Sequence, residues 1–176
     1  MRPRYLGIIV LAAAAIAAVT LVVSTAGSAP RAHESHSGKK ATRQSLFFAV
    51  LSGKKEISPT TGKKGAGDLD GRGTFSGLVD RGQTFCFGIT VTGLDTPILA
   101  HIHKGRRGEN GPIVIPLTPP SGGDPGASSG CVSADPNLLA DISKHPKRYY
   151  ANVHTNAFPG GAVRGQLAHP NGGINK

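Results

Sequence analysis

The sequence predicts an all-β fold, a Greek-key β-sandwich or barrel of about seven to eight strands with one short helix. Three observations lead to this class. Short runs of alternating apolar and polar residues recur between turns. Glycine (25 residues) and proline (13 residues) are abundant in a chain of 176 residues, which suits tight turns. Long helical patterns are absent, and the 38% hydrophobic content suffices for one core.

Residues 1–29 are expected to be a signal peptide or an N-terminal membrane anchor. A basic start, Met1–Arg4, precedes an uninterrupted run of apolar and small residues, Leu6–Val23. Small residues then offer cleavage after Ala26 or Ala29, but the run is also near the lower length limit of a membrane span. The protein is therefore expected to be exported, either secreted or anchored on the outer face of the cytoplasmic membrane. Contact with the membrane is expected only through this segment.

The β domain is expected to span residues 45–169. Before it, residues 30–44 are basic and lack apolar periodicity, which predicts a disordered linker. After it, residues 170–176 are expected to form a flexible tail. The first strand, Ser45–Leu51, is almost continuously apolar, which predicts burial on both faces or a place at the centre of a sandwich.

Six further strands are predicted, in three pairs. Asp80–Gln83 is a predicted turn with glycine where positive φ is needed, and the residues of the second arm alternate so that Phe85, Phe87, Ile89 and Val91 share the core face. The predicted pairs are Gly73–Val79 with Thr84–Thr92, Ile98–His103 with Pro112–Leu117, and Tyr149–Thr155 with Ala162–Ala168.

The region between the second and third pairs is predicted to be a linker followed by a helix. Thr118–Gly130 is rich in proline, glycine and serine, which predicts an irregular connection. Asp135 is a suitable N-cap and Pro136 suits the first helical position. The helix is expected to be short, because Pro146 stops it.

Two matched motifs dominate the second half of the chain. They read AHIHKGRRGENGPIVIPL at residues 100–117 and YYANVHTNAFPGGAVRGQL at residues 149–167. Together they resemble the CHRD domain, a module repeated in chordin and found singly in many bacterial exported proteins. The resemblance runs from about Leu46 to Leu167 and implies a β-sandwich or barrel without a general catalytic activity. Ala162 departs from the family pattern, which more often has glutamate before Arg-Gly-Gln-Leu.

Both motifs place histidine inside a strand. Residues two apart face the same side, so His101 and His103 share a face, and Asn152 and His154 share one with Tyr150. Two histidines on one strand and His154 on another could hold copper or zinc. The alternative is structural: the three imidazoles hydrogen-bond to the backbone or to one another and fix the register, because unpaired buried polar groups are costly.

Arg164 offers a second polar cluster. With Glu109 and Asn110 from the other motif, it is expected to form a buried or half-buried network that joins the two motifs. The alternative is an exposed arginine on an edge strand.

Cys86 and Cys131 are the two cysteines of the chain. An even number of cysteines in an exported protein predicts a disulfide bond, here between the middle strand and the segment before the helix. Metal or catalytic use of this pair is less expected, because no partner residue lies near either thiol in the sequence.

Composition and motifs limit the function. The formal charge of +10 favours contact with an anionic envelope polymer, or with an unknown protein partner. Nucleic acid is not expected as a partner, since the chain has no tryptophan and three tyrosines for stacking. No complete catalytic motif is present. The sequence predicts a non-enzymatic binding or structural module without a cofactor; the alternative is an extracytoplasmic copper- or zinc-binding protein.

Overall fold

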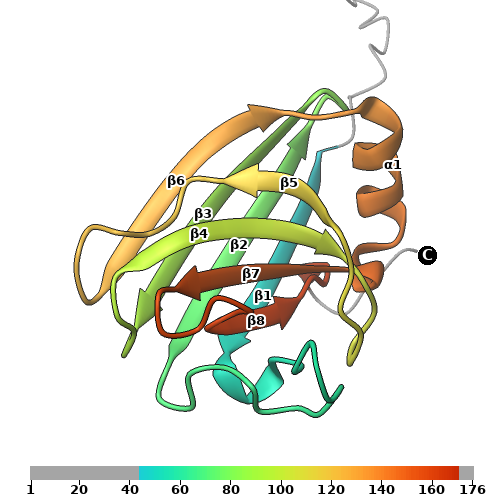
Figure 1. Cartoon of the computed structure of the whole chain (residues 1–176). Helices are drawn as coiled ribbons and strands as arrows, with labels where there is room; N and C mark the ends of the chain where they lie inside the picture. The colour runs from blue at the N-terminus through green and yellow to red at the C-terminus, as the bar shows by residue number, and fades with distance from the viewer. Residues whose placement is uncertain (1–43, 171–176) are drawn as a thin grey trace, which may run out of the picture. The chain divides into compact units, whose positions relative to one another are not determined.

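The computed structural model describes residues 44–170, which form one antiparallel sheet with a short α-helix (Figure 1). This confirms the predicted all-β class. The predicted signal or anchor segment, most of the linker, and the tail from Asn171 onward lie outside the described residues. Within residues 44–170, no helix has the length and apolar character to cross a membrane. The strands are β1 (Ser45–Ser52), β2 (Arg72–Asp80), β3 (Thr84–Thr92), β4 (Pro97–Lys104), β5 (Ile113–Leu117), β6 (Gly126–Ser133), β7 (Tyr149–Thr155) and β8 (Val163–Gln166), and the helix is α1 (Pro136–Lys144).

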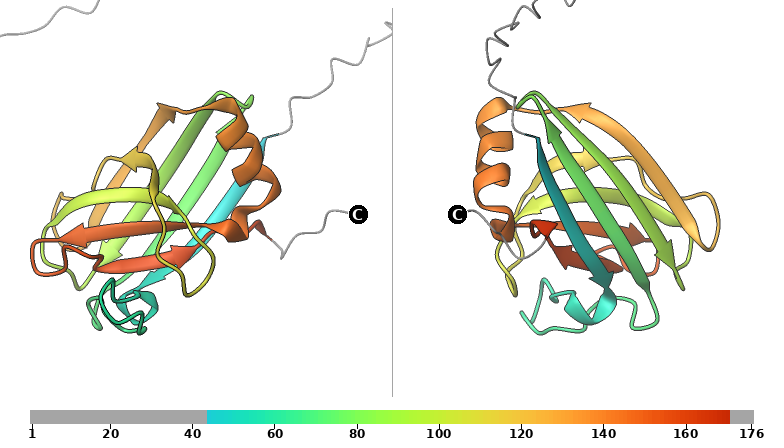
Figure 2. Two further views of the ribbon diagram at one scale, coloured as in Figure 1. Left: turned by 45° about the vertical axis from the view of Figure 1, so that its right-hand side comes forward. Right: turned by 180° about the vertical axis from the view of Figure 1, so that it is seen from behind.

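The sheet is strongly curled and nearly barrel-shaped (Figures 1 and 2). Its strand order is β5-β4-β7-β8-β1-β2-β3-β6, and every pairing is antiparallel. The half made of β5, β4, β7 and β8 thus faces the half made of β1, β2, β3 and β6. Single-turn 3-10 helices, Gly53–Lys55 and Pro146–Arg148, follow β1 and precede β7.

The core lies between the two halves of the sheet. β3 contributes the four residues that its alternation predicts, all at most 6% exposed: Phe85, Phe87, Ile89 and Val91. The other half contributes Ile102 from β4 and Val153 from β7, both fully buried. Each such side chain adds roughly 1.5–3 kcal/mol of hydrophobic stabilisation. The alternation of apolar and polar residues along a strand therefore determines which of its faces points into the core.

The predicted two-sided burial of β1 is wrong. Phe47, Ala49 and Leu51 point into the core, but Phe48 is 48% and Val50 is 66% exposed. The curled sheet encloses one face of each strand, and α1 lies at one end of the sheet, not over the outer face of β1 (Figure 2). An apolar run therefore did not distinguish a buried strand from one with an apolar outer face.

The predicted linker Thr118–Gly130 is too long. Its last five residues belong to β6, which pairs with β3 from Gly126↔Val91 to Ser133↔Thr84. β6 is built of small residues, GASSGCVS, and is held by backbone hydrogen bonds to its neighbour. Such a strand lacks the apolar alternation by which strands are recognised in a sequence.

The predicted hairpin and helix form as expected. Gly82 has a positive φ of 69° in the β2–β3 turn. Asp135 caps α1, because its Oδ1 accepts hydrogen bonds from the backbone N–H groups of Asn137 and Leu138 at 2.7 and 3.0 Å. Leu139 and Ile142 turn the apolar face of the helix into the core.

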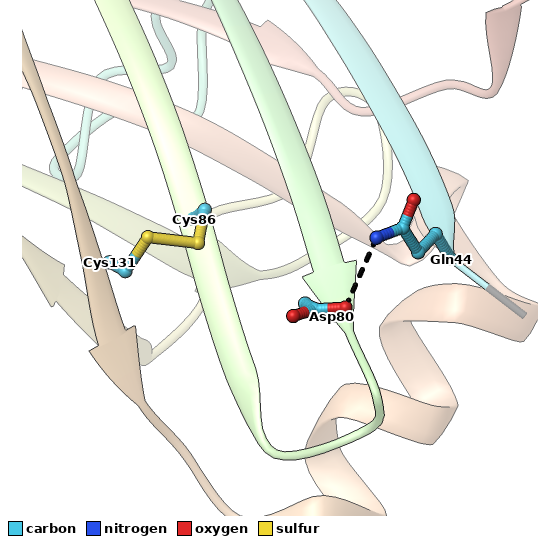
Figure 3. The surroundings of a disulfide bond; sticks show 4 residues. All are labelled: Gln44, Asp80, Cys86 and Cys131. Carbon is cyan, nitrogen blue, oxygen red and sulfur yellow. Dashed lines mark hydrogen bonds between the residues drawn. A yellow bond between two sulfur atoms is a disulfide. The ribbon is translucent and has the colours of Figure 1, made fainter. Parts of the chain in front are cut away.

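Cys86 and Cys131 lie opposite each other on β3 and β6, with their sulfur atoms at bonding distance, 2.08 Å (Figure 3). The two residues are 45 positions apart in the chain. The bond therefore fastens the terminal strand β6 to the meander of β1, β2 and β3.

Replacing both cysteines by serine is expected to lower the free energy of unfolding by about 4 kcal/mol, because the unfolded chain regains the entropy of a loop of this length. Urea unfolding of the variant and the oxidised protein measures the difference. Thiol titration of the unfolded, unreduced protein should detect no free cysteine; two free thiols would contradict the bond.

Candidate functional site

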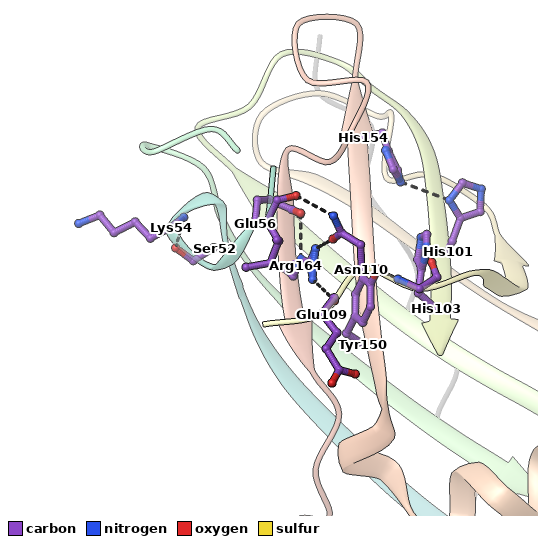
Figure 4. Close-up of polar contacts among 12 residues, drawn as sticks. Ser52, Lys54, Glu56, His101, His103, Glu109, Asn110, Tyr150, His154 and Arg164 are labelled. Carbon is purple, nitrogen blue, oxygen red and sulfur yellow. Dashed lines mark hydrogen bonds and ion pairs between the residues drawn. The ribbon is translucent and has the colours of Figure 1, made fainter. Parts of the chain in front are cut away.

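The polar residues of the two motifs gather on the outer face of β4, β7 and β8 (Figure 4). On this face His101, His103 and His154 are each at most 8% exposed. The alternate residues of the same strands, Ile102 and Val153 among them, belong to the core. Burial on an outer face means that loops cover it. Backbone carbonyls of the loops after β4 and after β7 contact the histidine rings directly.

The three imidazoles form one cluster. Nδ1 of His101 lies 3.3 Å from Nε2 of His154, and one nitrogen from each of the three rings lies within 4.8 Å of the others. The ring of His103 meets the ring of His101 edge-on, with centroids 5.6 Å apart. Strands β4 and β7 are direct neighbours in the sheet, which is what brings histidines 53 positions apart together.

Hydrogen bonds to carbonyl groups fix two of the tautomers. Nδ1 of His103 lies 2.9 Å from the carbonyl oxygen of Gly111, and Nδ1 of His154 lies 3.0 Å from that of Pro159. A carbonyl oxygen only accepts, so both Nδ1 atoms carry the proton and both Nε2 atoms present a lone pair. Nε2 of His154 therefore accepts from His101. Nε2 of His103 is buried and has no hydrogen-bond partner among the described residues.

All three imidazoles favour the neutral form. Burial, together with the neighbouring His154 and His103, lowers the pKa of His101 to about 4. Burial also lowers the pKa of His103 and of His154, against the opposing effect of their carbonyl partners. Neutral imidazoles at neutral pH are the state that a transition metal requires.

The distances within the cluster are compatible with a metal ion. With bonds of 2.0–2.1 Å, two nitrogens of a tetrahedral zinc site lie about 3.3 Å apart, which equals the hydrogen-bonded separation of Nδ1 of His101 from Nε2 of His154. A metal bound between these two atoms would require the proton on Nδ1 of His101 to leave that nitrogen. Metal-binding histidines commonly donate their second N–H to a carbonyl, as His103 and His154 do here. Asn152, opposite His101 in the β4–β7 ladder, adds a buried oxygen without a hydrogen-bond partner in the described part of the chain.

A second cluster is built on Arg164 of β8, which is 5% exposed. Its Nε donates to Oε2 of Glu56 at 2.9 Å, one terminal nitrogen donates to the carbonyl oxygen of Glu109 at 2.8 Å, and the other donates to the side-chain oxygen of Asn110. Its guanidinium lies over the ring of Tyr150, 4.3 Å from the centroid. The arginine thereby ties two loops to the sheet.

Tyr150 connects the two clusters. Its ring stacks on His103 with centroids 4.8 Å apart and an interplanar angle of 7°. Its hydroxyl accepts a hydrogen bond from the backbone N–H of Gly111, whose carbonyl in turn accepts from His103. The position of His103 thus depends on the stack of Tyr150 and Arg164 behind it.

Glu56 is a site residue that the sequence reading missed. Its carboxylate fits against Gly67 and Gly161; a Cβ atom at Gly161 would lie 2.6 Å from Oε2. The pKa of Glu56 is raised to about 7, because the effect of burial exceeds the opposing effect of Arg164. The one available signal was an acidic residue among the four lysines of its loop.

The family follows from a comparison with known proteins. A family model described as CHRD domain matches residues 47–167, which include both motifs and every residue of the two clusters. This chain belongs to the CHRD domain family. No curated protein and no solved structure matches it.

The CHRD domain brings together most of the residues singled out in the sequence. The three histidines meet, Asn152 lies beside them, and Arg164 joins Asn110. Glu109 takes part through its backbone carbonyl, while its carboxylate accepts from the N–H of Arg106. The alternative of an exposed Arg164 is not what the structure shows. The cysteine pair lies on β3 and β6, which are not strands of the site.

Substituting methionine for Arg164 is expected to destabilise the CHRD domain by about 3–5 kcal/mol, because Glu56 and two acceptors stay buried without their donor. Glu56→Gln should cost less, below about 2 kcal/mol, since burial already favours the neutral carboxyl and glutamine keeps an acceptor. Urea unfolding at pH 7 measures both. The control is Lys104→Met, which breaks an exposed ion pair with Asp141 and should cost less than about 1 kcal/mol.

The lowered pKa of His101 predicts acid sensitivity in metal-free protein. Between pH 4 and 6.5 the unfolded chain binds more protons at this residue than the folded chain, so its contribution to the free energy of unfolding is complete above pH 6.5 and is lost as the pH falls toward 4. Urea unfolding in EDTA across this window should show a steeper loss for the unmodified protein than for His101→Gln.

The comparison with His101→Gln is needed because Glu56 acts in the opposite direction. Its folded-state pKa lies above its ordinary value of 4.5, so its contribution is present below pH 4.5 and is lost as the pH rises toward 7. Glu56 is common to both proteins and cancels in the difference. Equal pH slopes for the two proteins would contradict the lowered pKa of His101.

Proposed function

We propose that this CHRD protein is an exported, non-enzymatic binding module whose histidine cluster, His101, His103 and His154, binds one copper or zinc ion. The observation that carries the proposal is the buried lone pair on Nε2 of His103, which faces a cluster in which His101 and His154 already have metal-ligand spacing. A metal ion would satisfy that atom. The carbonyl partners of His103 and His154 hold the rings in the required tautomers.

The surroundings of the cluster support binding without turnover. The buried acid Glu56 is engaged by Arg164, on the other side of Tyr150 from His103. The three histidines therefore have no adjacent carboxylate in the described residues that could serve as a general base. A metal held by three imidazoles would keep one position for water or for a ligand atom of a partner.

Export is supported by two features. The apolar run Leu6–Val23 after a basic start is typical of a signal or anchor segment. A disulfide bond between Cys86 and Cys131 suits an oxidising compartment outside the cytosol. The expected anionic envelope polymer stays a prediction from the net charge.

The test is calorimetric titration of EDTA-treated protein with Cu²⁺ and with Zn²⁺. One ion per chain should bind, with Cu²⁺ binding more tightly than Zn²⁺ because nitrogen ligands follow the Irving–Williams order. His103→Ala and His154→Ala should each weaken binding by at least about a hundredfold. His145→Ala, on a histidine outside the cluster, should leave the affinity unchanged.

A double variant, His33→Ala and His36→Ala, removes the histidines of the predicted linker and should still bind one ion per chain.

Unfolding in urea separates the proposal from the structural alternative. If added metal does not stabilise the unmodified protein, and the cluster variants lose stability equally with and without metal, the histidines serve only to hold the loops in place and the proposal fails.

A further inference from the structure

A groove lies on the outer face of the sheet where the β1–β8 ladder opens. The two strands pair at Ser52↔Arg164, and an isolated bridge joins Phe48 to Ala168. Between these points the ladder is interrupted, although Gly165 of β8 still lies close to the carbonyl group of Val50, and a groove of about 600 Å³ lies beside the interruption. This volume is within the range of small-molecule sites, which is roughly 300–1,000 Å³.

One wall of the groove is apolar. It is formed by Phe48 and Val50, the outward residues of β1, together with Ala168. Phe48 is 48% and Val50 is 66% exposed. Outward-pointing aromatic and branched residues in a row along one strand, bordering a concavity, are typical of a surface that binds an apolar group.

The rim of the groove is basic. Lys54, Lys55, Lys64 and Arg107 line it, and no aspartate or glutamate is among the residues that do. The cations come from the two loops that cover this end of the domain, since Lys64 lies next to Gly108. The ammonium of Lys55 lies beside β1, where it donates to the carbonyl oxygen of Val50. Burial lowers the pKa of Lys55, and the neighbouring Arg107 lowers it as well, so an anion placed here would favour the charged form of Lys55.

We propose that this groove binds a long-chain carboxylate, with the alkyl chain on Phe48 and Val50 and the carboxylate among Lys55, Lys64 and Arg107. The apolar wall would contact the alkyl chain of the ligand. The basic rim, which contains no acidic residue, would bind its negatively charged head group. The site is separate from the histidine cluster, and the inference does not depend on the proposed metal.

Charge argues against two other occupants. A second copy of the domain would bring an equally basic rim against this one. The chain's own linker, residues 30–44, carries four lysines and arginines and one glutamate, so it is basic as well. Like charges at a shared interface are unfavourable.

The test uses dodecanoate at concentrations below micelle formation, titrated into the purified protein and followed by calorimetry. One molecule per chain should bind, and added salt should weaken binding because the head group is held by exposed charges. Dodecyltrimethylammonium has the same tail with a positive head, and acetate has the head without the tail. Each should bind at least about tenfold more weakly than dodecanoate.

Two variants, each with a matched control, locate the site. The double variant Lys64→Glu, Arg107→Glu reverses two charges of the rim, and Phe48→Ser removes the aromatic ring of the apolar wall. Each should weaken dodecanoate binding at least about tenfold. The matched controls are Lys147→Glu and Ile98→Ser, an exposed lysine and an exposed isoleucine away from the groove, which should not change it. His103→Ala should also bind dodecanoate normally, which separates this inference from the metal proposal.

Unchanged binding in the rim variant would overturn the assignment, and so would equal binding of the cationic amphiphile. The rim residues Lys64 and Arg107 are exposed, so this variant tests the proposal even if Phe48→Ser fails to fold. Binding to vesicles of anionic phospholipid without binding of monomeric dodecanoate would also overturn it, because the face would then dock on a membrane surface.

Discussion

The buried guanidinium of Arg164 is the interaction on which the polar face of this domain depends. It joins three parts of the chain: β8, which carries it; the loop after β1, through Glu56; and the loop after β4, through Glu109 and Asn110. Further hydrogen bonds, such as those from Gly111 N–H to Tyr150 and from Asp68 N–H to the carbonyl of Ala162, hold the same loops, but Arg164 is the one side chain described here that contacts both. The loops then supply the carbonyl group that orients His103 and shield the histidines from water. The geometry of the histidine cluster therefore depends in part on the contacts of Arg164.

Burial of so many polar groups outside the barrel is costly unless each finds a partner. Most do, through backbone groups of the covering loops. The atoms left without a partner in the described residues are on Glu56, His103 and Asn152, all on this face. An ordered water or the metal ion proposed above would supply the missing partner of such an atom. The outer face of β4, β7 and β8 therefore combines a network of hydrogen bonds with three buried acceptor atoms that have no partner in the described residues.

The period-two pattern predicted the hairpins, the core face of β3 and the shared face of His101 and His103, because these depend on local backbone geometry. It failed for β1, since alternation is hidden when both faces are apolar, and for β6, since a strand of glycine and serine is defined by its neighbour. Glu56 could not be found because its partner lies 108 positions away. Pairing across such a distance depends on the sheet order, which the sequence does not display.

The position of the disulfide has a consequence for the free edge of the sheet. β6 ends the sheet order, so its free edge exposes backbone donors and acceptors on which another chain could add a strand. A strand of small side chains with few apolar anchors would peel from β3 readily and uncover a longer edge behind it. The covalent link between Cys86 and Cys131 keeps β6 paired with β3, so the backbone groups of β3 stay covered.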